Sequence, residues 1–170
     1  MQLYTLRCEM LTRSSLQETF AVFEDPYNLA KITPESLKFR VTSPGRVQMR
    51  KGAEIEYTIS WLGLPMHWKT LIREYEPPFF FVDEQAKGPY ALWRHRHTFE
   101  PAENGTKVGD RVDYALPFGP LGEVAHALMV RKQLLGIFNY RQQQLGKLFG
   151  DNAVQTVKPY IEKAGESGKR

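Results

Sequence analysis

The chain has 170 residues, of which 42% are apolar and 25% charged, a composition typical of a globular domain rather than a disordered or fibrous chain. The net charge of +4 is spread thinly, and because no run of five basic residues occurs, we expect no nucleic-acid partner. No apolar stretch has the length of a membrane span, and the first residues lack the apolar core of a signal peptide. The single cysteine, Cys8, excludes an intrachain disulfide and fits a reducing compartment. We therefore expect a cytoplasmic protein without stable membrane insertion.

Strand and helix patterns alternate along the first two thirds of the chain. Alternating apolar and polar residues predict a strand over about residues 2–12. The segment RSSLQETFAVFED predicts a helix, with Ser14 or Ser15 as its cap and Glu18 in its first turn. A second short helical segment, PYNLAKIT, ends at Pro34. Six strand-like runs follow, separated mainly by proline and glycine turns; they cover about residues 37–42, 53–62, 66–74, 79–86, 91–100 and 106–116.

The last third of the chain carries one long helical pattern, from about Leu121 to Phe149. Its apolar residues recur at three- and four-residue steps: Leu121, Val124, Ala125, Leu128, Leu135, Phe138, Leu145 and Leu148. Residues 151–170 have little apolar content and predict a flexible C-terminal tail, with one short docked turn as the alternative.

The order of these elements predicts an α+β domain over residues 1–150. Consecutive strands joined by short turns form an antiparallel meander, and the long helix is the only element large enough to cover one face of the sheet. We expect a helix-grip fold, in which a curved antiparallel sheet of about seven strands wraps around the C-terminal helix, with two short helices after the first strand. Where the sheet curls further than the helix can fill, a cavity remains.

Alternation along the strands predicts which side chains face this cavity. The turns suggest strand registers that pair Tyr57 with Thr70, Thr70 with Asp83, Asp83 with Trp93, Phe81 with His95, and His97 with Asp110. In these registers Arg94 and Arg96 point to solvent, whereas the histidines beside them point inward. The expected ligand-binding residues are the inward polar and aromatic ones: Tyr57, Trp68, Thr70, Phe81, Asp83, Trp93, His95, His97, Asp110 and Tyr114. A mostly apolar lining with a few polar groups is typical of a small-molecule site.

The segment FVDEQAKGPYALWRHRHTFEPAENGTKVGDRVDYALPFGPLG resembles the central motif of a bacterial branch of the START-like, or SRPBCC, superfamily. The resemblance extends from WKTLIREYEPPFFFVDEQ to IFNYRQQQL and covers about residues 2–149. Members of this branch are often described as polyketide cyclase/dehydrase or ligand-binding domains. The resemblance implies a helix-grip fold with a deep hydrophobic cavity. Its relatives bind lipids, sterols or polyketides, and some are cyclases or hydrolases, so the fold alone implies no single function.

Three interpretations of the paired histidines stay open. His95 and His97 could bind a metal with Asp83 or Asp110 as a third ligand. No further histidine or cysteine is near in the sequence, so we expect neither a metal nor a cofactor. A catalytic pair of His97 and Asp110, with His95 as a further candidate, could act as an oriented base in a cyclisation or dehydration. Alternatively, Asp110 only satisfies a buried histidine by hydrogen bonding.

We therefore expect a protein that binds a small hydrophobic or amphipathic molecule, of lipid, polyketide or aromatic type, in an internal cavity. One alternative is an aromatase/cyclase-like or dehydratase-like enzyme that uses the same residues. The other is a protein-interaction module with a vestigial cavity. The sequence leaves the oligomeric state open.

Overall fold

The computed structural model describes residues 1–61, 63–150 and 153–164 of the chain. These residues form an antiparallel sheet of eight strands in the order β2-β3-β4-β5-β6-β7-β1-β8. The strands are β1 (Tyr4–Thr12), β2 (Arg40–Val41), β3 (Glu54–Trp61), β4 (Leu64–Glu76), β5 (Phe80–Lys87), β6 (Leu92–Ala102), β7 (Gly105–Ala115) and β8 (Ala153–Lys163). The predicted α+β helix-grip fold is confirmed.

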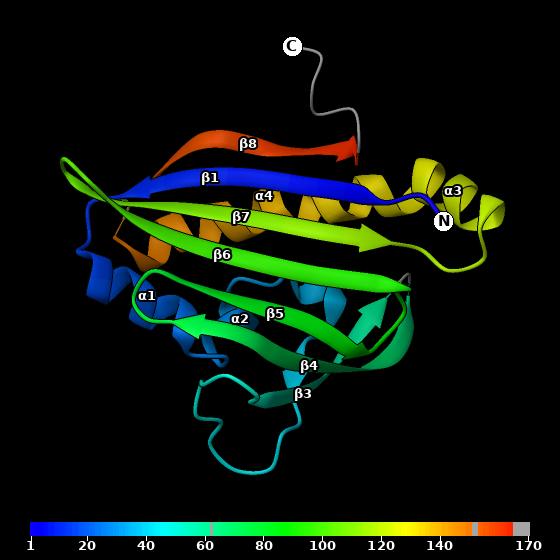
Figure 1. The fold of residues 1–170 in the computed structure, drawn as a ribbon, viewed down its shortest axis with the longest axis horizontal. Helices are drawn as coiled ribbons and strands as arrows, with labels where there is room; N and C mark the ends of the chain where they lie inside the picture. The colour runs from blue at the N-terminus through cyan, green and yellow to red at the C-terminus, as the bar shows by residue number, and fades with distance from the viewer. Residues whose placement is uncertain (62, 151–152, 165–170) are drawn as a thin grey trace.

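The helices lie in two groups. After β1 come the short helices α1 (Leu16–Glu24) and α2 (Asn28–Lys31) and a 3₁₀ turn, η1 (Glu35–Leu37). After β7, three consecutive pieces form one helical stretch: α3 (Pro120–Ala125), the π-helical η2 (His126–Val130) and α4 (Arg131–Leu148). Figure 1 shows α4 running behind β1 and β7, with α1 and α2 beneath the other strands. The sheet therefore wraps around the long helix on one face only.

The first helix is held by the predicted cap. The Ser15 hydroxyl accepts a hydrogen bond from the Glu18 backbone N–H, and the Glu18 carboxylate accepts one from the backbone N–H of Ser15. This reciprocal arrangement satisfies donors that the first helical turn leaves free. The helix then buries Phe20, whose ring meets that of Phe99 on β6 edge-on at a centroid distance of 5.2 Å. The capped helix thus closes one end of the core.

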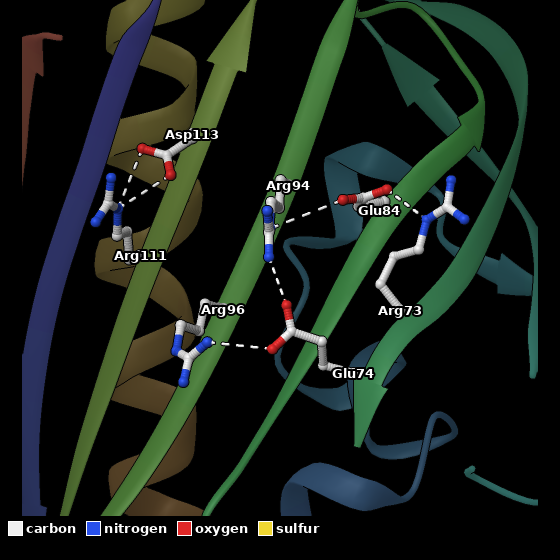
Figure 2. A network of polar contacts seen from close by, with 7 residues as sticks. All are labelled: Arg73, Glu74, Glu84, Arg94, Arg96, Arg111 and Asp113. Carbon is white, nitrogen blue, oxygen red and sulfur yellow. Dashed lines mark hydrogen bonds and ion pairs between the residues drawn. The ribbon is translucent and has the colours of Figure 1, made fainter. Parts of the chain in front are cut away.

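The register between β6 and β7 agrees with the prediction. His97 pairs with Asp110, and Trp93 pairs with Tyr114. As expected from alternation, Arg94 and Arg96 lie on the outer face of the sheet, where both contact Glu74 (Figure 2). The histidines of β6 therefore face the interior.

The other three predicted registers are wrong, by two residues between β3 and β4, between β5 and β6, and at residues 70–72 of the β4–β5 pair. Strand β3 pairs with β4 so that Trp61 lies opposite Leu64, and Tyr57 therefore lies opposite Trp68 instead of Thr70. Likewise, Asp83 lies opposite His95 instead of Trp93. A shift of two residues keeps every side chain on its face of the sheet. The side chains predicted to point inward therefore still do so, but they lie beside other residues of the adjacent strands than predicted.

The third wrong register is that between β4 and β5, where Ile72 pairs with Asp83 instead of Phe81. A β-bulge follows in β4 between Ile72 and Glu74. The bulge adds Arg73 to the outer face, where it forms an ion pair with Glu84 (Figure 2). Bulges of this kind increase the local twist of a sheet. Here the bulge contributes to the curl that separates the strands from the helix.

The predicted inward face of the long helix is wrong in its first turns. Leu121, Val124 and Leu128 are exposed, at 76%, 57% and 73%. The π-helical η2 adds a residue to the turn, which rotates the chain relative to a regular 3.6-residue repeat. The buried residues of η2 and α4 are His126, Val130, Leu134, Phe138, Gln142 and Leu145.

The predicted flexible tail differs from the structure over residues 153–163. This segment forms β8, which pairs with β1, and its Ile161 is 7% exposed. Pro159 lies at the irregularity in the pairing of β8 with β1, between the pairs Arg7–Tyr160 and Glu9–Val157. A proline, which has no backbone N–H to donate to the neighbouring strand, is tolerated at such an irregularity. The low apolar content of the tail was misleading because an edge strand gains its hydrogen bonds from its neighbour. The predicted tail residues 151–152 and 165–170 lie outside the described residues.

Candidate functional site

A cavity of about 180 Å³ lies between the sheet, the short helices and α4. Apolar side chains from all three sides form most of its wall, among them Phe23, Leu29, Ile32, Ile55, Ile59, Ile72, Leu134, Ile137 and Phe138. Polar side chains interrupt this wall on the strands, with Thr70, Asp83, His95 and His97, on α4, with Gln133 and Arg141, and near the short helices, with Glu24, Asp25, Asn28 and Thr33. The cavity is therefore mostly apolar with several polar groups, as expected for a small-molecule site; the histidines, Asp83 and Arg141 are called its polar side below.

Eight of the residues that the sequence predicted for ligand binding line this cavity: Tyr57, Trp68, Thr70, Phe81, Asp83, Trp93, His95 and His97. Two others do not line it. Asp110 lies behind the histidines, where it is 7% exposed. Tyr114 packs instead against Tyr4, and its hydroxyl lies 2.8 Å from Nε2 of His126. Its partner on the neighbouring strand, Trp93, does line the cavity.

Asp110 joins the two histidines from behind. Its Oδ1 lies 2.9 Å from Nε2 of His95 in a well-directed hydrogen bond, and 2.8 Å from Nδ1 of His97. The second distance is that of an ion pair, but its direction is unsuitable, so Nδ1 of His97 has no hydrogen-bond partner among the described residues. The sequence paired Asp110 with His97 alone; the structure shares this carboxylate between both rings.

Asp83 faces the same histidines from the cavity side. Its Oδ2 lies 3.1 Å from Nε2 of His97 and 3.8 Å from Nδ1 of His95. The ring of Phe81 stacks on that of His97 at a centroid distance of 4.3 Å. The two-residue register shift between β5 and β6 produces this arrangement, because it sets Asp83 beside His95 and Phe81 beside His97.

Charges within the cluster set the protonation states. Burial alone would raise the pKa of Asp110, but the Arg141 guanidinium and the two histidines lower it well below its usual range. Burial would likewise raise the pKa of Asp83, yet its hydrogen bond to His97 and the charges around it lower that pKa. Both carboxylates are therefore ionised at neutral pH.

The two histidines shift in opposite directions. Burial, followed by the charge of His97, lowers the pKa of His95 to about 4. Burial also acts to lower the pKa of His97, but its contacts with Asp110 and Asp83 outweigh burial and raise it. Two titratable groups whose pKa values are shifted in opposite directions are suited to distinct acid and base roles.

Arg141 on α4 is the main site residue that the sequence reasoning missed. Its guanidinium lies 5.9 Å from the ring centroid of Phe23 and 5.8 Å from that of Phe138, and the residue lines the cavity. Its Nε is buried and has no hydrogen-bond partner among the described residues. Its spacing gave a signal, because Phe138, Arg141 and Leu145 stand three and four residues apart on one helical face.

A second polar group of the cavity centres on Thr70. Its hydroxyl accepts a hydrogen bond from Nε1 of Trp68 at 3.1 Å and lies 3.2 Å from the hydroxyl of Tyr57. The indole of Trp68 in turn meets that of Trp93 edge-on at a centroid distance of 5.5 Å. These contacts fix the aromatic part of the wall, since a buried indole N–H needs a partner.

The arrangement can serve two chemical purposes. The His97 ring lies between two carboxylates and can hold or transfer a proton at the cavity surface. Asp83, His95 and His97 also each offer one ligand atom, and these atoms lie within 4.8 Å of one another. Cys8 is not a nucleophile here: it is 1% exposed, and burial followed by the nearby Asp110 raises the pKa of its thiol.

Comparison with solved structures supports the fold. Ginseng major latex-like protein 151 from Panax ginseng aligns with a TM-score of 0.64 and 12% identity, over 88% of this chain and 99% of its own. Protein Ms6760 from Mycobacterium smegmatis aligns with a TM-score of 0.62 and 15% identity, over 86% and 91%. Protein TTHA0849 from Thermus thermophilus aligns with a TM-score of 0.62 and 14% identity, over 87% and 95%. At these identities the likeness concerns the fold alone.

A search of the curated proteins finds no match. Among the described residues, no helix has both the length and the apolar character needed to cross a membrane. The family model described as polyketide cyclase / dehydrase and lipid transport matches residues 14–136, which include α1, the strands of the cavity wall and the start of α4. The chain therefore belongs to the polyketide cyclase/dehydrase and lipid transport family.

Proposed function

We propose that this protein binds a small, mostly apolar molecule in the cavity, with the polar end of that molecule against His97, Asp83 and Arg141. The observation that carries the proposal is an apolar cavity lined by Arg141, whose Nε is buried and has no hydrogen-bond partner among the described residues. A buried donor without a partner costs about 1–3 kcal/mol, which a ligand oxygen would recover. The family match supports a ligand-binding domain in general. The buried free thiol of Cys8 is consistent with the cytoplasmic location that we also propose.

The volume of the cavity limits the size of the ligand. Pockets for drug-sized molecules measure about 300–1,000 Å³, and an apolar cavity of about 150 Å³ binds benzene. The cavity of about 180 Å³ in this protein lies close to the lower case. We therefore favour a compact ligand of one or two rings, or a short polyketide fragment, over a lipid with two long chains.

Binding of matched aromatic probes tests this proposal. Naphthalene-2-carboxylate and its neutral methyl ester would be titrated while the fluorescence of Trp68 and Trp93, which line the cavity, is followed. We expect Arg141→Met to weaken the carboxylate at least about tenfold, the usual effect of losing one charge-assisted hydrogen bond, and to spare the ester. The control is Lys132→Met, which removes the same charge from an exposed position on α4.

The outcomes separate the proposed functions. If neither probe binds the wild-type protein, the ligand-binding proposal fails and the protein-interaction module gains support. Equal weakening by Arg141→Met and Lys132→Met would mean that long-range charge, rather than the cavity, attracts the carboxylate. Native mass spectrometry of the freshly purified protein would show whether an organic molecule stays bound.

A second candidate is a cyclase-like or dehydratase-like enzyme. The position of His97 between Asp83 and Asp110 favours it, because this ring can take up and release a proton beside a bound molecule. A conservative His97→Gln change would then abolish conversion of a linear poly-β-ketone while the neutral methyl ester still binds. Conversion that survives this change would exclude His97 as the base.

A further inference from the structure

Three donor groups converge on the polar side of the cavity. Nε2 of His97 lies 3.1 Å and Nδ1 of His95 lies 3.8 Å from the same oxygen of Asp83. Two ligand atoms bound to one metal ion at about 2.0–2.2 Å stand about 3.0–3.5 Å apart, depending on the angle between them. The distance from Asp83 to His97 falls within this range, and the distance from Asp83 to His95 exceeds its upper end by about 0.3 Å. Small side-chain adjustments would therefore bring all three donors to bonding distance of one ion.

Asp110 supplies the support that such ligands need. Metal-bound histidines almost always direct their second ring nitrogen to a carboxylate, a backbone carbonyl or water. The second nitrogens of both rings, Nε2 of His95 and Nδ1 of His97, lie within 2.9 Å of one Asp110 oxygen. Because His95 donates its Nε2–H to Asp110, the lone pair of its neutral ring is at Nδ1, on the side of Asp83. Asp110 thus orients the His95 ring through a hydrogen bond and lies 2.8 Å from Nδ1 of His97, on the side of that ring away from Asp83.

The fixed charges also favour a cation at this point. Asp83 and Asp110 place two carboxylates around the histidines, whereas Arg141 is the only arginine or lysine among the described residues that line the cavity; Glu24 and Asp25 line it as well. Arg141 comes from the opposite side, on α4, and forms no ion pair with either carboxylate within the described part of the chain. A divalent ion bound to Asp83 and the two histidines would be attracted by both carboxylates.

We propose that Asp83, His95 and His97 bind one divalent transition-metal ion at the polar side of the cavity, with Asp110 orienting His95. Two imidazoles and one carboxylate suit Zn²⁺, Fe²⁺ or Mn²⁺ better than Ca²⁺ or Mg²⁺, which prefer oxygen ligands. Because all three ligands line the cavity, the open coordination positions face the cavity. The inference departs from the sequence-based expectation of no metal, which saw two histidines but not the closeness of Asp83. It does not depend on the identity of an organic ligand.

The test is metal binding by the full chain after treatment with a chelator. Co²⁺ and Zn²⁺ would be titrated into the stripped protein, with calorimetry for stoichiometry and the visible spectrum of Co²⁺ for coordination. We expect one ion per chain. Asp83→Asn and His95→Gln should weaken binding at least about tenfold each, and Asp110→Asn by about 10–100-fold, the usual effect of losing an outer carboxylate.

His67 provides the matched control. It lies in β4 with its Nε2 3.3 Å from Glu56, and both side chains are 38% exposed, so it is a histidine–carboxylate pair outside the cavity. His67→Gln should leave the affinity unchanged. An affinity that falls with His67→Gln but not with Asp83→Asn would overturn the proposal, as would the absence of any bound ion.

A measurement on the unmodified protein covers the case in which a variant does not fold. In nitrogen-15 spectra of the histidine rings, added Zn²⁺ should shift Nδ1 of His95 and Nε2 of His97, and should leave His67 and His126 unshifted. Shifts confined to His67 or His126 would contradict the site. Binding of the neutral aromatic ester to the metal-free protein, measured in parallel, separates failure of the metal site from failure of the cavity.

Discussion

The hydroxyl of Tyr114 lies 2.8 Å from Nε2 of His126, so that β7 is tied to the π-helical turn at the start of the long helix. Tyr114 is fully buried, and its ring stacks on that of Tyr4 at a centroid distance of 5.6 Å. This contact joins the sheet to the helix at a distance from the cavity. The contact therefore stabilises the packing of the helix against the sheet and does not bind a ligand.

Removing this hydroxyl should lower stability without affecting binding. We expect Tyr114→Phe to reduce the free energy of unfolding by about 1 kcal/mol, since one buried hydrogen bond is lost and His126 is left without that partner. Urea unfolding would measure the loss, and the aromatic probes would bind as before. Tyr160→Phe on β8, where the ring is 42% exposed, is the control. A weaker probe affinity in Tyr114→Phe would return Tyr114 to the binding site.

The hydroxyl of Thr70 should matter more than its size suggests. Thr70→Val keeps the shape of the side chain but leaves Nε1 of Trp68 without its acceptor and Tyr57 without its neighbour. We expect a loss of about 1–3 kcal/mol in the free energy of unfolding. The same change at Thr58, which lies on the other face of the adjacent β3, should cost less than half as much. Equal losses would show that the hydrogen bonds of Thr70 contribute nothing specific.

Acid should destabilise the metal-free protein through His95. Its pKa is about 4 in the folded chain and near its ordinary value of 6.5 in the unfolded chain. Between these values the unfolded chain binds a proton that the folded chain does not. The stability contributed by the neutral His95 is therefore present above pH 6.5 and is lost as the pH falls toward 4, by about 3 kcal/mol in all.

Urea unfolding at several pH values, with a chelator present, measures this effect. In His95→Gln the fall in stability between about pH 6.5 and about pH 4.5 should be clearly shallower than in the wild type. His67→Gln, on the outer face, should retain the wild-type slope. Parallel slopes in wild type and His95→Gln would assign the acid sensitivity to other groups.

The C-terminal strand offers a direct test of its docking. Ile161→Ala should lower the free energy of unfolding by about 2–5 kcal/mol, because this side chain is buried against the core. Val154 on the same strand is 63% exposed, and Val154→Ala should change stability by less than about 0.5 kcal/mol. Thermal unfolding of both variants gives the comparison. If the tail were flexible, the two changes would be indistinguishable.

The sequence predicted which side chains point inward or outward better than it predicted which residues pair across neighbouring strands. Alternation along β6 was sufficient to place His95 and His97 inside and Arg94 outside, because a strand has only two faces. The lateral partners depend on how many residues each turn consumes, which the turn chemistry left uncertain by two. That difference decides the site, since it moves Asp83 from Trp93 to His95.

Two further features escaped prediction for physical reasons. The π-helical turn is a local irregularity with no strong sequence signal, and it changes which residues of the long helix face the sheet. Arg141 was missed because arginines are mostly exposed, so its place in a helical pattern does not indicate a cavity. Only the curl of the sheet, which leaves a space above α4, allows this side chain to remain inside.

The thiol of Cys8 gives the protein a built-in reporter. It lies 3.7 Å from Asp110 behind the two histidines, on the strand that β7 and β8 flank. Because it is the only cysteine and is 1% exposed, an alkylating reagent can reach it only when this part of the sheet opens. The rate at which Cys8 is alkylated in the native protein therefore measures how often this part of the sheet opens, without any added chromophore.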